Sequence, residues 1–183
     1  MKERRSILDL FKPIKKEQTY TYSRFKELNS YRSYFSKFGN NIYASDDVRA
    51  CVRALSEHTS KANPRCTNKQ IERLLALKPN QYMNGKDMLA KLRNILEIKN
   101  TAFLYIERDN LNHVIGFYPV PYETAEAMEY KNGLFVQFHF SGRATKKWTI
   151  PWEDLAVIRN DYLDSDIFGE TNLPLLSTLE VIN

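Results

Sequence analysis

The chain has 183 residues, of which 43% are hydrophobic and 27% are charged, an ordinary globular balance that excludes wholesale disorder. No run of 18 apolar residues occurs, and no apolar segment follows the basic start, so the sequence predicts neither a membrane-spanning helix nor a secretory leader. The two cysteines, Cys51 and Cys66, lack the spacing of a disulfide framework and are typical of an intracellular protein.

The net charge of +5 is divided unevenly along the chain. Residues 1–100 hold 21 Lys and Arg against 10 Asp and Glu, a net +11, whereas residues 101–183 hold 6 against 12, a net −6. A basic half can attract nucleic acid, and an acidic half can dock on a basic neighbour. Scattered charges on solvated helix faces are the more ordinary interpretation.

The first 44 residues combine basic and aromatic side chains. The aromatic run YTYSRFKELNSYRSYFSKFGNN is interleaved with Lys and Arg, a composition that stacks bases and neutralises phosphates. Because the aromatic residues have no fixed period, we favour a loosely ordered arm that packs on a neighbour. The candidate contacts to nucleic acid or to a partner are Lys12, Lys15, Lys16, Arg24, Lys26, Arg32 and Lys37.

Residues 45–98 show the period of three amphipathic helices. Ser45 is the expected cap of the first helix, Thr67 and Gln70 have the spacing of a capping box for the second, and Asn84 is the expected cap of the third. The predicted buried stripes are Val48, Cys51, Val52 and Leu55, then Ile71, Leu74, Leu75 and Leu77, then Met88, Leu89, Leu92, Ile95 and Leu96.

From residue 101 the hydrophobic period changes to two, which predicts strands. Asp109-Asn110 begins the first turn, and Asn-Gly and Ser-Gly pairs are hairpin signals between the later strands. The predicted strands are Thr101–Arg108, Val114–Tyr118, Glu126–Tyr130, Leu134–Phe140, Lys147–Ile150 and, after a break at residues 151–154, Leu155–Arg159.

The last segment, LPLLSTLEVIN, predicts an amphipathic helix that runs to the end of the sequence without a cap. We therefore expect an α+β fold in which N-terminal helices precede an antiparallel β meander and a truncated helix closes the chain. The expected division is an arm over residues 1–44 and one α+β domain over residues 45–183.

Catalytic and metal-binding patterns are weak. Asp109 followed by Glu129 and Lys131 mimics the carboxylate and lysine spacing of a Mg²⁺-dependent nuclease, but Asp109 and Lys131 fall in predicted turns, where these residue types are common. The spacing of Cys51, His58 and Cys66 fits no usual zinc site. We expect no catalytic residue, no metal site and no cofactor. Packing in the core is also the expected role of Trp148 and Trp152.

Several phrases, taken in order, resemble the portal proteins of tailed bacteriophages. They are DDVRACVRALSEHTSKAN, LLALKPNQYMNGKDMLAKLRNILEIKNTAFLYIERD, IGFYPVPYETAEAM, WTIPWEDLAVIRN and FGETNLPLL, and together they cover roughly residues 45–183. Each phrase alone is a weak signal, but five in the family's order and spacing are a strong one. Two departures are Lys99-Asn100-Thr101-Ala102, where the family usually has Gly-Asn-Ala, and Arg159, where it often has His.

The resemblance implies a structural, non-enzymatic subunit of a ring at one capsid vertex, through which double-stranded DNA is packaged and ejected. It implies a homo-oligomer, expected to number twelve subunits, with capsid, scaffold, terminase and head-tail connector proteins as partners and no membrane. The implied location is the virion head vertex, and the bacterial cytoplasm during assembly. Family members are much longer, so this chain is expected to be the N-terminal wing portion.

Two other functions stay open at the level of sequence. The first is a nucleic-acid-binding α+β domain that uses the basic N-terminal half as its footprint. The second, less favoured, is the Mg²⁺-dependent nuclease.

Overall fold

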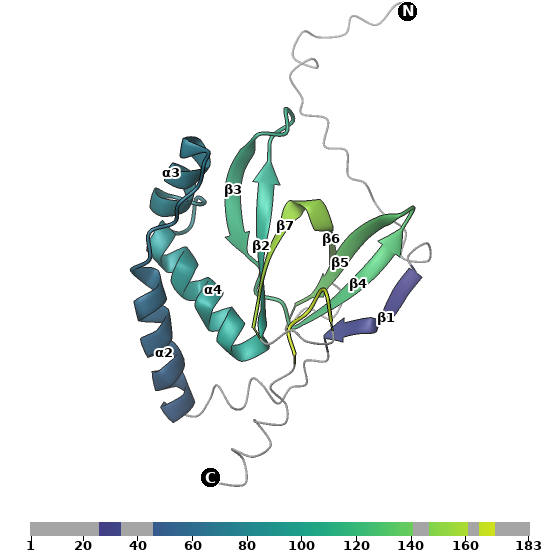
Figure 1. The fold of residues 1–183 in the computed structure, drawn as a ribbon, viewed down its shortest axis with the longest axis horizontal. Helices are drawn as coiled ribbons and strands as arrows, with labels where there is room; N and C mark the ends of the chain where they lie inside the picture. Colours follow the sequence, from purple (N-terminus) through teal and green to yellow (C-terminus); the bar gives the residue numbers. More distant parts are fainter. Residues whose placement is uncertain (1–25, 34–45, 141–146, 161–164, 171–183) are drawn as a thin grey trace, which may run out of the picture.

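The computed structural model describes residues 26–33, 46–140, 147–160 and 165–170, and its elements are drawn in Figure 1. The described part is an α+β fold of three helices and two small antiparallel sheets, as expected. Within it, no helix is long and apolar enough to cross a membrane. The elements are β1 (Lys26–Ser33), α2 (Asp46–Ser60), α3 (Lys69–Leu77), α4 (Gly85–Lys99), β2 (Thr101–Arg108), β3 (Val114–Pro119), β4 (Thr124–Tyr130), β5 (Gly133–His139), β6 (Lys147–Pro151), the 3₁₀ turn η3 (Trp152–Asp154) and β7 (Leu155–Arg159).

The two sheets have simple antiparallel orders. One has four strands in the order β1-β4-β5-β6, and the other has three in the order β3-β2-β7. The chain crosses from the three-stranded to the four-stranded sheet between β3 and β4, and it returns through η3, which joins β6 to β7. Figure 1 shows the three-stranded sheet between the helices and the four-stranded sheet.

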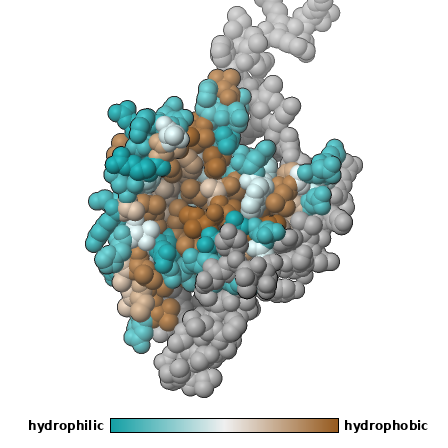
Figure 2. All heavy atoms as spheres, viewed as in Figure 1, coloured by the Kyte–Doolittle hydropathy of each residue, from teal (hydrophilic) through white to brown (hydrophobic). Residues whose placement is uncertain are grey.

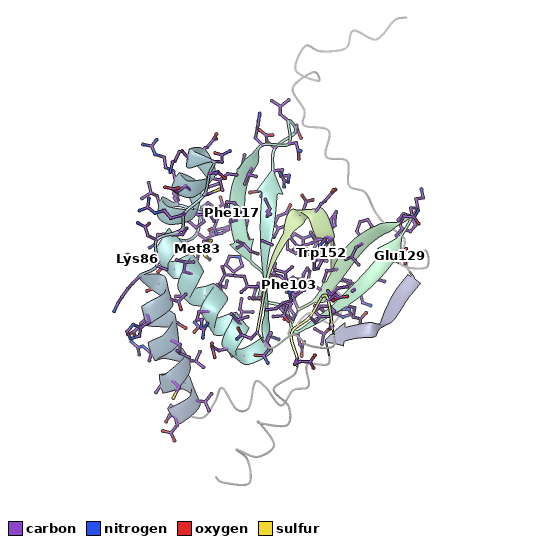
Figure 3. All side chains as sticks on the ribbon, viewed as in Figure 1. Met83, Lys86, Phe103, Phe117, Glu129 and Trp152 are labelled. Carbon is purple, nitrogen blue, oxygen red and sulfur yellow. The ribbon has the colours of Figure 1, made fainter. Side chains whose placement is uncertain are left out.

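One hydrophobic core joins both sheets to the helices. Phe103 of β2 has no exposed surface, and its ring meets those of Tyr122, Phe138 and Phe168 edge to face, with centroids 5.3, 5.0 and 6.1 Å away. Figure 3 shows Phe103 between the two sheets. On the helix side, the predicted α4 stripe is confirmed at Met88, Leu92, Ile95 and Leu96, which are buried, while Leu89 is partly buried. Burial of this kind is the main stabilising contribution in a domain of this size.

Two of the three predicted helix caps fall on described residues, and one of these two is confirmed. The Asn84 side chain accepts a hydrogen bond from Asp87 N at 2.9 Å, so Asn84 caps α4 as predicted. At α3 the prediction of Thr67 was wrong, because Asn68 is the cap and its Oδ1 accepts from Gln70 N at 2.9 Å and from Ile71 N at 3.3 Å. A helix has one N-cap, and Asn competes well for that position.

The predicted apolar stripe of α2 was partly wrong. Val52 is buried, but Cys51 is exposed and Leu55 is 41% exposed. The second buried residue of this helix is Ser56, whose hydroxyl donates to Val52 O at 2.7 Å and also bonds Asn94 of α4. Because α2 packs along a narrow line on α4, only one side of the expected stripe is covered.

The sequence missed strand β1, which lies inside the expected N-terminal arm. It pairs antiparallel with β4, with a register shift between Glu27 and Arg32. The capping role of Ser45 and the predicted C-terminal helix over residues 173–183 lie outside the described residues.

Candidate functional site

Of the seven basic residues predicted to contact nucleic acid or a partner, the structure describes two, Lys26 and Arg32. Lys26 and Arg32 belong to β1, where the register sets Lys26 opposite Glu129 and Arg32 opposite Glu126 of β4. These two positions therefore face acidic positions of this same chain across the ladder. The other candidates, Lys12, Lys15, Lys16, Arg24 and Lys37, lie outside the described residues.

The nuclease-like pattern is not brought together. Asp109 lies in the β2–β3 turn, where its Oδ1 accepts from Leu111 N and His113 N at 2.8 Å each and its Oδ2 lies 3.2 Å from His113 Nδ1. These bonds, chiefly the one from the His113 backbone, lower the pKa of the carboxyl group. Glu129 belongs to the other sheet and lies near the tip of the β4–β5 hairpin in Figure 3. Asp109 is therefore a turn residue, as expected.

Metal-binding clusters do not form among the described residues, where no group of three His, Cys, Asp or Glu side chains is arranged to hold an ion. Cys51 lies on α2, whereas Cys66 belongs to the loop before α3, where its N–H donates to Glu72 Oε2 at 3.0 Å.

The two tryptophans, both expected in the core, differ in burial. Trp152 packs against the core, whereas Trp148 is 41% exposed.

A first surface feature is a groove between α3 and the edge strand β3. Leu77 is 69% exposed and Ile115 is 50% exposed, and between them lie the half-buried Leu74 and Val114. We call this surface the basic groove, because its rim carries two cations. Its residues are Gln70, Arg73, Leu74, Leu77, Lys78, Val114 and Ile115.

A second feature is a polar hollow between β2 and η3. At its wall, Arg108 Nε donates to Asp154 Oδ1 at 3.1 Å, so the charges of these two side chains offset each other. Glu153, the residue before Asp154, is exposed to solvent. Burial raises the pKa of the Tyr105 hydroxyl, and the charges of Asp154 and Glu107 raise it further. We call this surface the acidic hollow, and its residues are Tyr105, Ile106, Arg108, Asn112, Glu153 and Asp154.

A third feature is the junction at the end of α4. Asn100 has a left-handed backbone (φ 53°) and donates its N–H to Leu96 O at 2.8 Å, which ends the helix. The segment 165–170 is fastened to this point, because Gly169 N donates to Thr101 Oγ1 at 2.8 Å and Asn100 Nδ2 donates to Glu170 O at 2.7 Å. These bonds hold residues 169 and 170 against the end of α4 and the start of β2.

A half-buried lysine, Lys99, braces the same region. Lys99 Nζ donates to Glu123 O at 3.0 Å and lies 4.7 Å from the centre of the Tyr122 ring. Burial lowers the pKa of this ammonium group to about 8, although the Glu123 charge opposes the change. The Tyr122 hydroxyl donates to Thr101 O at 2.7 Å, and burial raises its pKa. These contacts tie α4 to the β3–β4 connection.

The described residues thus form an α+β fold with a groove, a polar hollow and a hydrogen-bonded junction at the end of α4, and this fold is shared with solved structures. It resembles a chain in the neck of the native gene transfer agent (GTA) particle, computed with C12 symmetry, with a TM-score of 0.62 and 12% identity over 81% of this chain and 42% of that chain. A chain in the neck of the empty GTA particle, computed with C6 symmetry, gives a TM-score of 0.65 and 11% identity over 83% and 44%. A chain in the virion of the native particle gives 0.61 and 12% identity over 82% and 42%.

The TM-scores show a common fold, and at identities this low the likeness shows the fold alone. This chain spans less than half the length of each of those chains. No family model and no curated protein matches the sequence.

Proposed function

We propose that this chain forms the wing portion of a portal-type subunit, a structural component of the ring at one vertex of a phage or phage-like particle. The observation that carries the proposal is the fold shared over 81% of this chain with a chain of a neck computed with C12 symmetry, of which this chain covers 42%. The order of the five sequence phrases supports the same conclusion independently. If this chain is the wing of a longer subunit, most of this chain should match but less than half of the longer chain should be covered, as the 81% and 42% values have it.

The proposed role is mechanical rather than catalytic. Identical subunits close a cyclic ring through head-to-tail contacts, and double-stranded DNA passes through the channel during packaging and ejection. Each phosphate neutralised by the channel would add salt-sensitive affinity, which would oppose sliding, so phosphate contacts of the wing should be few. The partners of this role are the capsid, scaffold, terminase and head-tail connector proteins, and the location is the head vertex of the virion.

Electron microscopy of the full-length product, purified without other phage proteins, tests the proposal. The expected result is a closed ring with a central channel, with residues 46–170 on its periphery. A monomeric full-length protein, or a ring in which these residues line the narrowest part of the channel, would contradict it.

A further inference from the structure

We propose that the basic groove of one copy contacts the acidic hollow of a second copy in a head-to-tail arrangement. The idea deepens the proposed function and rests on it for the presence of repeated copies. The surfaces themselves are argued below from this chain alone. In Figure 1, α3 lies beside β3 on one side of the β2–β3 hairpin and η3 lies on the other, so elements that line the two surfaces lie on opposite sides of this hairpin.

The basic groove has the composition of a protein-binding surface. Leu77 and Ile115 come from two different elements and leave apolar area in water over a half-buried floor. Figure 2 shows hydrophobic residues reaching the surface over the helices and at the β2–β3 hairpin. Covering such a patch removes apolar surface from water, which favours association.

The cations on the groove rim are available to a partner. Among the described residues, neither Arg73 nor Lys78 forms an ion pair, and both side chains are exposed. In contrast, Arg65 in the loop before α3 and Lys69 in its first turn share the carboxylate of Glu72 at 3.7 and 3.1 Å. The rim therefore presents two uncompensated positive charges beside an apolar surface.

The acidic hollow carries the complementary properties. Glu153 is exposed and, among the described residues, forms no ion pair, whereas Asp154 is paired with Arg108, so Glu153 is the uncompensated negative charge of the hollow. Next to it, the Trp148 ring is 41% exposed and packs against Tyr105 with centroids 5.0 Å apart. The hollow thus offers negative charge beside exposed aromatic surface.

The charges of the two layers point to a copy of this chain as the occupant. Residues 46–100 hold 11 Lys and Arg against 6 Asp and Glu, a net +5, and the described residues from 101 to 170 hold 4 against 9, a net −5. Complementary surfaces on opposite sides of one protein cannot satisfy each other within that copy. They produce a heterologous contact, which builds rings or rows rather than two-fold dimers.

The contact is expected to be weak in this chain. Stable interfaces bury on the order of 1,200 to 2,000 Å², more than one groove and one hollow of this size provide. Exposed charges are also screened over about 8 Å at physiological salt. We therefore expect self-association that strengthens with protein concentration and weakens as salt is added.

Sedimentation velocity of the full chain at low salt, over a concentration series, tests the contact by charge reversal. The double variant Arg73→Glu/Lys78→Glu and the single variant Glu153→Lys should each weaken self-association at least about tenfold, because like charges then meet. The variants mixed in equal amounts should associate again, since each supplies the surface that complements the other. The triple variant should associate as well.

The matched control is Lys61→Glu/Lys86→Glu, which makes the same change in net charge at two exposed positions outside the groove, one directly after α2 and one in α4. Figure 3 shows Lys86 pointing away from the sheets. This control should associate more strongly than the groove variant. Monomeric wild type at every concentration, equal loss in the control, or no recovery in the mixture would overturn the contact. A missing ring in the full-length protein would instead contradict the proposed function and leave the charge-reversal result standing.

Discussion

Gly169 is a residue at which a single methyl group should matter. A Cβ atom there would lie 2.5 Å from Asn160 O and closer still to Asn100 O, both of which are backbone atoms that cannot rotate away. We expect Gly169→Ala to lower the free energy of unfolding by about 2–4 kcal/mol, because the junction at the end of α4 must open. Urea unfolding measures this loss.

The control for Gly169 is Gly133→Ala in the β4–β5 hairpin. There the added atom would approach the Phe135 ring at 3.1 Å, and a side chain can adjust. This variant should lose clearly less stability. Equal losses at the two positions would show that the junction is looser than described.

Lys99 should give the domain an unusual pH dependence. Its pKa is about 8 in the folded chain and about 10.5 in the unfolded chain, so between these values the unfolded state binds more protons. The contribution of this group to the free energy of unfolding therefore rises with pH across that window. We expect wild type to gain stability relative to Lys99→Met between pH 7 and pH 9.5.

Urea unfolding of both proteins at several pH values measures the Lys99 effect. The comparison stays below pH 10, because the raised pKa of Tyr122 contributes in the opposite direction above it. Lys86→Met removes an exposed charge from the same helix and serves as the control. A constant difference between wild type and Lys99→Met over this range would contradict the prediction.

The cap of α3 allows a test at the scale of one element. Asn68 satisfies two backbone N–H groups of the first turn, whereas Thr67 lies one residue earlier and is exposed. We expect Asn68→Ala to lower the free energy of unfolding by about 1 kcal/mol, while Thr67→Ala has little effect. Thermal or urea unfolding of the pair decides between the two caps, and the opposite order would restore the capping box.

Regular elements with a clear period were predictable from the sequence. Thr101–Arg108 forms β2 with the predicted bounds, because its alternation and the following Asp109 turn are both local signals. Strand β1 has no such signal, since its only apolar residues are Leu28 and Tyr31, three positions apart. It exists through its pairing with β4, almost a hundred residues later in the chain. Long-range pairing of this kind is invisible to a local pattern.

The surfaces were less predictable than the elements. The basic groove brings Leu77, at the end of a helix, beside Ile115, in a strand that begins 37 residues later. The sequence places Leu77 on a buried stripe, and only the position of β3 shows that its side chain is left exposed. The junction at Asn100 likewise depends on Gly169, which belongs to the phrase FGETNLPLL, but no local pattern in that phrase shows that it packs against the end of α4.

For the whole molecule, we expect one cooperative unfolding transition. The Phe103 ring contacts side chains of the other sheet and of the segment 165–170, so the sheets share a core. The two tryptophans lie in β6 and η3, whereas the helices lie beyond the three-stranded sheet, so tryptophan fluorescence and the helical signal in far-ultraviolet circular dichroism report different regions. Their urea midpoints should coincide, and Phe103→Leu should shift both by the same amount. Separate midpoints would show two independent units.

The junction at Asn100 has a mechanical consequence. Tension applied to the chain beyond Glu170 is borne first by the bonds from Asn100 Nδ2 to Glu170 O and from Gly169 N to Thr101 Oγ1. Thr101 is the first residue of β2, the middle strand of its sheet, and hydrogen-bonded neighbours flank this strand on both sides. The load is therefore shared across two ladders instead of peeling a strand from the edge of the sheet.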